Sequence, residues 1–64
     1  MNVDRAAERV RAEFEEMPGM TLTVPQAARL FGLETDVCQL VVDRLVGAAY
    51  LRWTNGGAVT RGDR

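Results

Sequence analysis

The chain has 64 residues and contains no histidine, no serine and no lysine. Without these side chains it lacks the usual pairs of nucleophile and general base that catalyse group transfer and hydrolysis. The run from Thr54 to Gly57 is rich in glycine, but it has neither the lysine nor the strand-to-helix context of a P-loop. We therefore expect no enzyme activity and no bound cofactor.

Cysteine is almost absent. The single Cys38 cannot form an internal disulfide, and the chain has no Cys/His set that would bind zinc. We expect no metal site and a reducing, cytoplasmic location. Charged residues are spread through the first ten positions, and no apolar run approaches the roughly 20 residues of a membrane span. These patterns predict a protein that is neither secreted nor inserted in a membrane.

The composition that remains, 47% hydrophobic and 27% charged, is that of a globular domain. Residues 1–64 are predicted to form one domain with a small core, because a chain of this length buries only about 60% of the surface that it exposes when unfolded. The formal net charge is −1 at pH 7. The chain as a whole therefore lacks the broad positive field that supplies most non-specific affinity for nucleic acid.

Charge is unevenly distributed along the chain. The first 20 residues carry five acids and three arginines, whereas residues 43–64 carry four arginines and two aspartates. The C-terminal end therefore has a formal local charge of +2, which favours a modest phosphate contact there. The acidic run of Glu13, Glu15 and Glu16 is more typical of a solvated helix face than of a binding site.

The first predicted element is a helix, because its apolar residues recur at helical spacing. Its apolar stripe consists of Val3, Ala7, Val10, Phe14 and Met17. Residues 3–17 are predicted to form an amphipathic helix. On its solvated face Arg9 and Arg11 each precede a glutamate by four residues, which predicts two ion pairs. Pro18 and the glycine after it end the helix.

A second helix is predicted over residues 24–31. Thr23 is placed to cap it, Gln26 reaches back as in a capping box, and Pro25 suits the first turn. Gly32 ends the helix, because glycine accepts the left-handed conformation found past helix ends. The residues just before this helix, Met20 to Leu22, are predicted to form a short strand that pairs with the C-terminal hairpin.

The third helix is predicted over residues 36–47, with Thr35 as its cap and Asp36 at the positive end of its dipole. Its apolar face consists of Cys38, Val41, Val42 and Leu45. Cys38 is thus interpreted as a core thiol rather than a redox sensor. Residues 50–61 are predicted to form a β-hairpin about the Asn55-Gly56-Gly57 turn, with Trp53 packed on the core or half-buried.

Residues 24–41, VPQAARLFGLETDVCQLV, resemble a bacterial helix-turn-helix. The residues that carry the resemblance are Ala28, Gly32, Leu33, Cys38 and Val41. Ala28 lets the two helices approach closely, and Gly32 permits the tight reversal between them. From residue 3 to 60, the order of helix, strand, helix, helix and hairpin resembles a winged helix. The resemblance implies a mainly α fold with a small β-hairpin, a three-helix winged helix-turn-helix (α-β-α-α-β-β).

In winged-helix proteins the third helix usually enters the DNA major groove and the wing contacts the backbone. The resemblance implies a groove-facing side of Asp36, Val37, Gln39, Leu40, Asp43 and Arg44. Our first hypothesis is therefore a transcriptional regulator that binds double-stranded DNA. The DNA-binding residues it assigns are Arg29, Gln39, Leu40, Arg44, Arg52 and Arg61. A homodimer through the first helix is expected, because a single small module covers only about 600–1,000 Å² of DNA-facing surface.

The second hypothesis is a protein-interaction module that keeps this fold and does not bind DNA. Asp36 and Asp43 lie on the helix that would read DNA, where they would approach DNA phosphates of like charge. An apolar centre with a charged rim suits a protein partner instead, and the partner-binding residues would be Val37, Leu40 and Asp43. The helix-turn-helix pattern and the arginines of the wing narrowly favour the first hypothesis.

Overall fold

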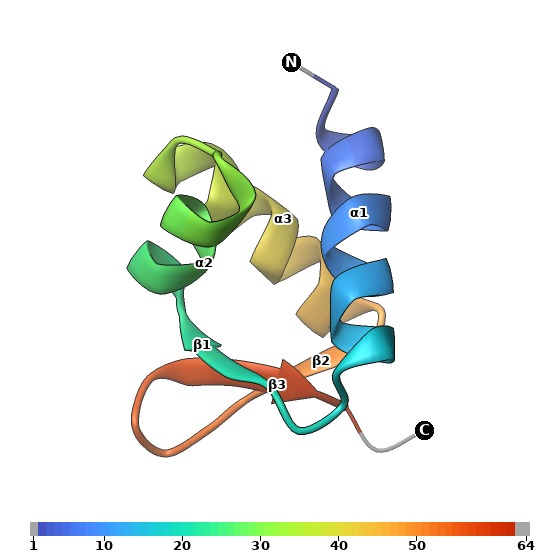
Figure 1. Cartoon of the computed structure of the whole chain (residues 1–64), viewed down its shortest axis with the longest axis vertical. Helices are drawn as coiled ribbons and strands as arrows, with labels where there is room; N and C mark the ends of the chain where they lie inside the picture. The colour runs from blue at the N-terminus through green and yellow to red at the C-terminus, as the bar shows by residue number, and fades with distance from the viewer. Residues whose placement is uncertain (1, 63–64) are drawn as a thin grey trace.

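The structure, a computed structural model, describes residues 2–62. Its elements are α1 (Val3–Glu16), β1 (Thr21–Thr23), α2 (Val24–Phe31), α3 (Thr35–Gly47), β2 (Leu51–Trp53) and β3 (Ala58–Arg61). The three helices lie on one side of the small sheet, which forms the base of the molecule (Figure 1). This mainly helical layout agrees with the predicted order of elements. Two charges counted at the C-terminal end, Asp63 and Arg64, lie outside the described residues.

The sheet is antiparallel with the order β1-β3-β2, so the last strand of the chain is the central one. Val59 of β3 is paired with Leu22 on one side and with Trp53 on the other. Directly paired residues share one face of a sheet, so these three side chains lie on the side of the buried Val59. The prediction that a short strand before α2 pairs with the hairpin is confirmed, with the strand one residue later than expected.

Helix α1 is capped by Asn2, whose side chain accepts a hydrogen bond from the backbone N–H of Arg5. Its predicted extension to Met17 is wrong. The backbone leaves the helical conformation at Met17, so this side chain departs from the buried stripe and is 49% exposed. The predicted ion pair between Arg11 and Glu15 is present at 3.1 Å. Residues 2–62 contain no such pair for Arg9, which donates to the carbonyl of Phe31 instead.

Helix α2 has the predicted bounds because the predicted capping features form at both of its ends. The hydroxyl of Thr23 accepts from the N–H of Gln26, and the Gln26 side chain accepts from the N–H of Thr23. At the other end Gly32 is left-handed, with φ +69°. The predicted cap of α3 is wrong: Thr35 is already helical, and Glu34 occupies the cap position without a side-chain hydrogen bond.

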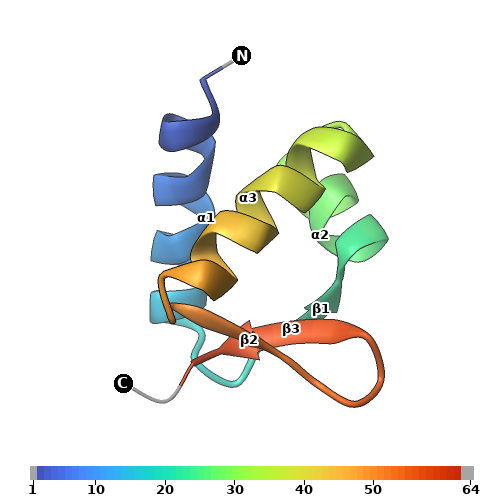
Figure 2. The same cartoon turned by 180° about the vertical axis from the view of Figure 1, so that it is seen from behind.

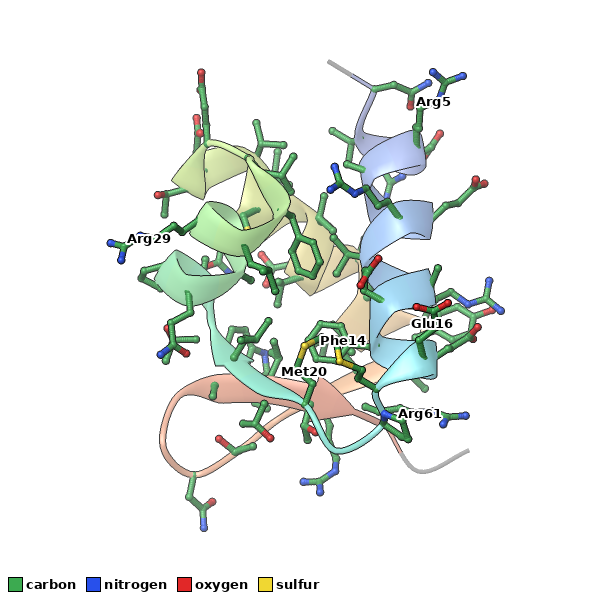
Figure 3. All side chains as sticks on the ribbon, viewed as in Figure 1. Arg5, Phe14, Glu16, Met20, Arg29 and Arg61 are labelled. Atoms are coloured by element: carbon green, nitrogen blue, oxygen red, sulfur yellow. The ribbon has the colours of Figure 1, made fainter. Side chains whose placement is uncertain are left out.

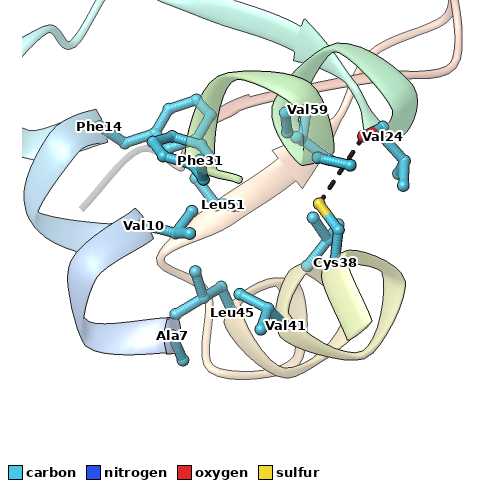
Figure 4. Close-up of a cluster of buried hydrophobic side chains, with 13 residues drawn as sticks. Ala7, Val10, Phe14, Val24, Phe31, Cys38, Val41, Leu45, Leu51 and Val59 are labelled. Atoms are coloured by element: carbon cyan, nitrogen blue, oxygen red, sulfur yellow. Dashed lines mark hydrogen bonds between the residues drawn. The ribbon is translucent and has the colours of Figure 1, made fainter. Parts of the chain in front are cut away.

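The core is a cluster of apolar side chains from all three helices and from β2 and β3 (Figure 4). Cys38 is fully buried in it, and its thiol donates to the carbonyl of Val24 at 3.7 Å. Burial raises the pKa of this thiol. The interpretation of Cys38 as a core residue is confirmed. Trp53 lies on the face of the sheet that covers the core, but at the margin of the core, and 42% of this residue is exposed.

Two left-handed residues shape the C-terminal third of the chain. Gly57 (φ +81°) closes the hairpin, where the N–H of Thr54 donates to the carbonyl of Ala58. Ala49 (φ +66°) closes α3, as the N–H groups of Ala49 and Tyr50 donate to carbonyls of the last helical turn. Ala49 is the one non-glycine residue within 2–62 with a positive φ.

The longest helix among the described residues, α1, has 14 residues. None of the helices there is both long enough and apolar enough to cross a membrane.

Candidate interaction surface

The outward face of α3 is fixed by its buried face. Cys38, Val41, Val42 and Leu45 hold the helix on the core. The opposite side is therefore turned to solvent, and it carries Asp36, Leu40 and Asp43, all exposed. Figure 2 shows this helix running between α1 and α2 on the near side of the molecule. Leu40, in the middle of this face, is 57% exposed.

The polar side chains next to Leu40 are bonded to their own protein. The amide nitrogen of Gln39 donates to Oδ1 of Asp43 at 2.9 Å, one turn further along α3. Asp36 accepts a hydrogen bond from the N–H of Val37 with its Oδ1. Of the predicted DNA-reading residues, Gln39 therefore has a hydrogen-bond donor that is already in use.

Arg44 is the cation of α3, and it is paired with Asp4 of α1. The pair lies on the side of α3 that faces α1, and both side chains are largely exposed. Because Asp4 neutralises this arginine, the outward face of α3 is left with the negative charge of Asp36 and Asp43. Two carboxylates around an exposed leucine define what we call the α3 face: Asp36, Leu40 and Asp43.

Val37, which was also assigned to partner binding, is half-buried. It is partly buried and packs against the core cluster, whereas Leu40 and Asp43 are exposed. The structure therefore brings Leu40 and Asp43 together on one surface, with Val37 at its edge.

The remaining predicted DNA-binding residues are exposed but do not share a surface. In the antiparallel pairing of β2 with β3, Arg52 lies opposite Thr60 and Arg61 lies opposite Leu51. The two arginines of the hairpin therefore lie on opposite faces of the sheet. Arg61 lines a small cavity beside Arg11 of α1. Figure 3 shows Arg29 of α2 and Arg61 pointing to opposite sides of the molecule.

One feature that the sequence did not predict is a groove between the start of α1 and the end of α2. Arg5 and Arg9 of α1 and Phe31 of α2 are among the residues that line it. The only local signal is the spacing of two arginines four residues apart, which puts like charges on one helix face. Since the groove is formed by two segments distant in the chain, helical periodicity alone does not reveal it.

Within residues 2–62, no group of three His, Cys, Asp or Glu side chains is placed to hold a metal ion. Helix α1, through which a dimer was expected, buries Ala7, Val10 and Phe14 inside the monomer. A dimer contact through this helix would therefore use its polar side, and it stays a prediction.

Comparison of the chain with models of known protein families, with curated proteins and with solved structures finds no match. Function must therefore follow from the chemistry of the surfaces described above.

Proposed function

We propose that this chain is a winged-helix domain that acts as a protein-interaction module, with the α3 face as its binding surface. The observation that carries the proposal is Leu40, exposed at the centre of the outward helix between Asp36 and Asp43. Burying the exposed part of such a side chain against a partner contributes about 1 kcal/mol. The order of the helices and strands supports the winged-helix assignment.

The charges of the α3 face define the partner. Asp36 and Asp43 lie on either side of Leu40 along the helix, and the neighbouring Arg44 is already neutralised by Asp4. A complementary surface has an apolar pocket rimmed by arginine or lysine. Such complementarity steers association and rejects partners of the wrong charge more than it adds raw affinity.

The same features weigh against α3 as a DNA-reading helix. Phosphates would meet the carboxylates of Asp36 and Asp43, which repel them. Base reading needs free side-chain donors in the major groove. In this helix one N–H of the Gln39 amide is bonded to Asp43, and the charge of Arg44 is partly neutralised by Asp4, so both side chains are less available to bases and phosphates.

Duplex DNA is a second candidate, favoured by one observation. Arg29, Arg52 and Arg61 are exposed, and none of them forms an ion pair with any residue from 2 to 62. Free arginines of this kind bind phosphates without reading the sequence. Because they lie on different sides of the molecule, they support a weak contact through one or two of them rather than a specific site.

The test of the α3 face uses two leucines of equal exposure. Leu40 is 57% exposed and Leu30, on α2, is 55% exposed. Peptides selected from a display library on the wild-type chain are expected to combine an apolar residue with arginine or lysine. Leu40→Asp should weaken their binding at least tenfold, while Leu30→Asp should leave it unchanged. Equal loss in both variants, or no loss in either, would contradict the proposal.

The DNA alternative is tested by fluorescence anisotropy with a mixed duplex pool at low and at physiological salt. Under our proposal, micromolar protein shows no salt-sensitive binding. Binding that falls steeply as salt rises, and that Arg52→Glu with Arg61→Glu removes, would establish phosphate contact and put DNA in first place.

A further inference from the structure

The groove between α1 and α2 has a composition that differs from the rest of the surface. It has a volume of about 310 Å³ and is lined by Asn2, Arg5, Ala6, Arg9, Val10, Phe31 and Leu33. The lining thus combines two arginines and one asparagine with four apolar residues, and it contains no acidic residue. The volume is at the lower end of the about 300–1,000 Å³ typical of small-molecule sites.

Arg9 is held over the groove by the end of α2. Its Nη1 donates to the backbone carbonyl of Phe31 at 3.4 Å. A guanidinium has five N–H donors, so most of them remain free for another acceptor. The predicted partner of Arg9 on its own helix, Glu13, forms no ion pair with it.

Arg5 lies one helical turn before Arg9 on α1 and lines the same groove, and it also has no ion pair among residues 2–62. Its exposed side chain points away from α2 (Figure 3). Because residues four apart on a helix have Cβ atoms about 5–6 Å apart, rotation of this side chain brings both guanidinium groups within reach of one anion. Like charges four residues apart on a helix repel each other by a few tenths of a kcal/mol. An anion between the two guanidinium groups removes this repulsion. Carboxylates suit the position, because arginine binds them with two parallel hydrogen bonds.

The floor of the groove is apolar and continuous with the core. Val10 and Phe31 are buried core residues, and Ala6 and Leu33 are partly buried and packed against the core cluster. An apolar group resting here covers Ala6 and Leu33 and removes their exposed surface from water. An apolar floor with Arg9 over it and Arg5 one helical turn away matches a molecule with an apolar body and one anionic end.

We infer that this groove binds a small amphipathic carboxylate. Its carboxylate lies between Arg5 and Arg9, and its short alkyl or aryl body lies on Ala6, Phe31 and Leu33. The inference is independent of the proposed function, because it uses no residue of the α3 face.

The experiment is a titration of the ¹⁵N-labelled full chain with octanoate, followed through amide chemical shifts. Octanoate is expected to bind with a dissociation constant below about 1 mM and to shift the amides of residues 5–10 and 31–33. Two control molecules separate the contribution of the carboxylate from that of the alkyl chain. Octan-1-ol lacks the charge and acetate lacks the apolar body, and each is expected to bind at least tenfold more weakly.

Variants of the two arginines complete the test. Arg5→Gln and Arg9→Gln should each weaken octanoate at least fivefold, while Arg29→Gln, on the exposed side of α2, should have no effect. Equal binding of octanol and octanoate, or equal binding by the Arg9→Gln and wild-type chains, would overturn the inference. So would a protein mass in sedimentation equilibrium that rises with concentration and is lowered by Arg9→Gln, because the groove would then be an interface between two copies.

Discussion

Arg44, near the end of α3, is paired with Asp4, in the first turn of α1. Each charge also lies at the helix end where the helix dipole favours it, the acid near an N-terminus and the base near a C-terminus. The pair therefore joins two helices that are far apart in the sequence, and it offsets part of the positive charge that α3 would offer to DNA.

We predict that this pair makes a small, salt-sensitive contribution to stability. Because both side chains are largely exposed, a double-mutant cycle of Asp4→Ala and Arg44→Ala should give a coupling energy of about 0.2–1 kcal/mol. The measurement is urea unfolding of the four proteins, and 0.5 M salt should reduce the coupling through screening. A coupling that is unchanged by salt would show that the two residues interact through packing rather than charge.

The capping box of α2 should contribute more to stability than the ion pair. Thr23→Ala removes the acceptor of the Gln26 N–H and should cost about 1 kcal/mol in the free energy of unfolding. Thr21→Ala is the matched control, since this exposed threonine of β1 caps no helix, and it should cost less than about 0.5 kcal/mol. Equal losses would mean that the Thr23 hydroxyl has no capping role.

Ala49→Gly is predicted to stabilise the protein. The positive φ of Ala49 costs a residue with a Cβ about 1–2 kcal/mol, and glycine removes this cost while adding about 0.5–1 kcal/mol of backbone entropy in the unfolded chain. A net gain of about 0.5 kcal/mol or more should appear in thermal or urea unfolding. Ala48→Gly is the control, because Ala48 has φ −89° and should lose stability.

Gly62→Ala is predicted to destabilise the protein. A Cβ on Gly62 would lie 2.6 Å from the backbone carbonyl oxygen of Ala49, and backbone cannot move aside as a flexible side chain can. Displacing it should cost about 1–3 kcal/mol. The same unfolding measurement checks this, and a loss of less than about 0.5 kcal/mol would show that the chain end moves away freely.

The thiol of Cys38 should react only when the chain unfolds. It is fully buried, and burial raises its pKa, so the folded state keeps the thiol protonated. Above about pH 8.5 the unfolded thiol begins to ionise while the folded one does not, so stability is full below that pH and falls as pH rises toward the folded pKa. Labelling with a thiol reagent should therefore accelerate with urea. Rapid labelling of the native chain would contradict this.

Local signals accounted for much of the fold. The bounds of α2 are predictable because Thr23, Gln26 and Gly32 act through hydrogen bonds and φ values within a few residues. The buried position of Cys38 follows from helical spacing in the same way. Met17 shows where such reasoning fails: it has the correct spacing, but the helix ends one residue before it.

The candidate sites depend on contacts between distant segments, which spacing does not reveal. The sequence identified Leu40 as an exposed apolar residue between acids, but it did not show that Arg44 would be neutralised by Asp4. It placed Arg52 and Arg61 together in the wing, whereas the strand register puts them on opposite faces of the sheet. Nor does anything in the sequence mark Ala49, because glycine is the usual residue at such a helix end.

The central position of β3 has a consequence for synthesis of the protein on the ribosome. β1 is made first, yet its hydrogen-bonding partner is β3, whose residues are made almost 40 positions later. Helices of 8 to 14 residues are only marginally stable by themselves, and the sheet that covers their base cannot close until residue 61 has emerged. Cooperative folding of this domain is therefore delayed until nearly all of it has been translated, and a chain that stops before Ala58 lacks the strand that joins the two edge strands.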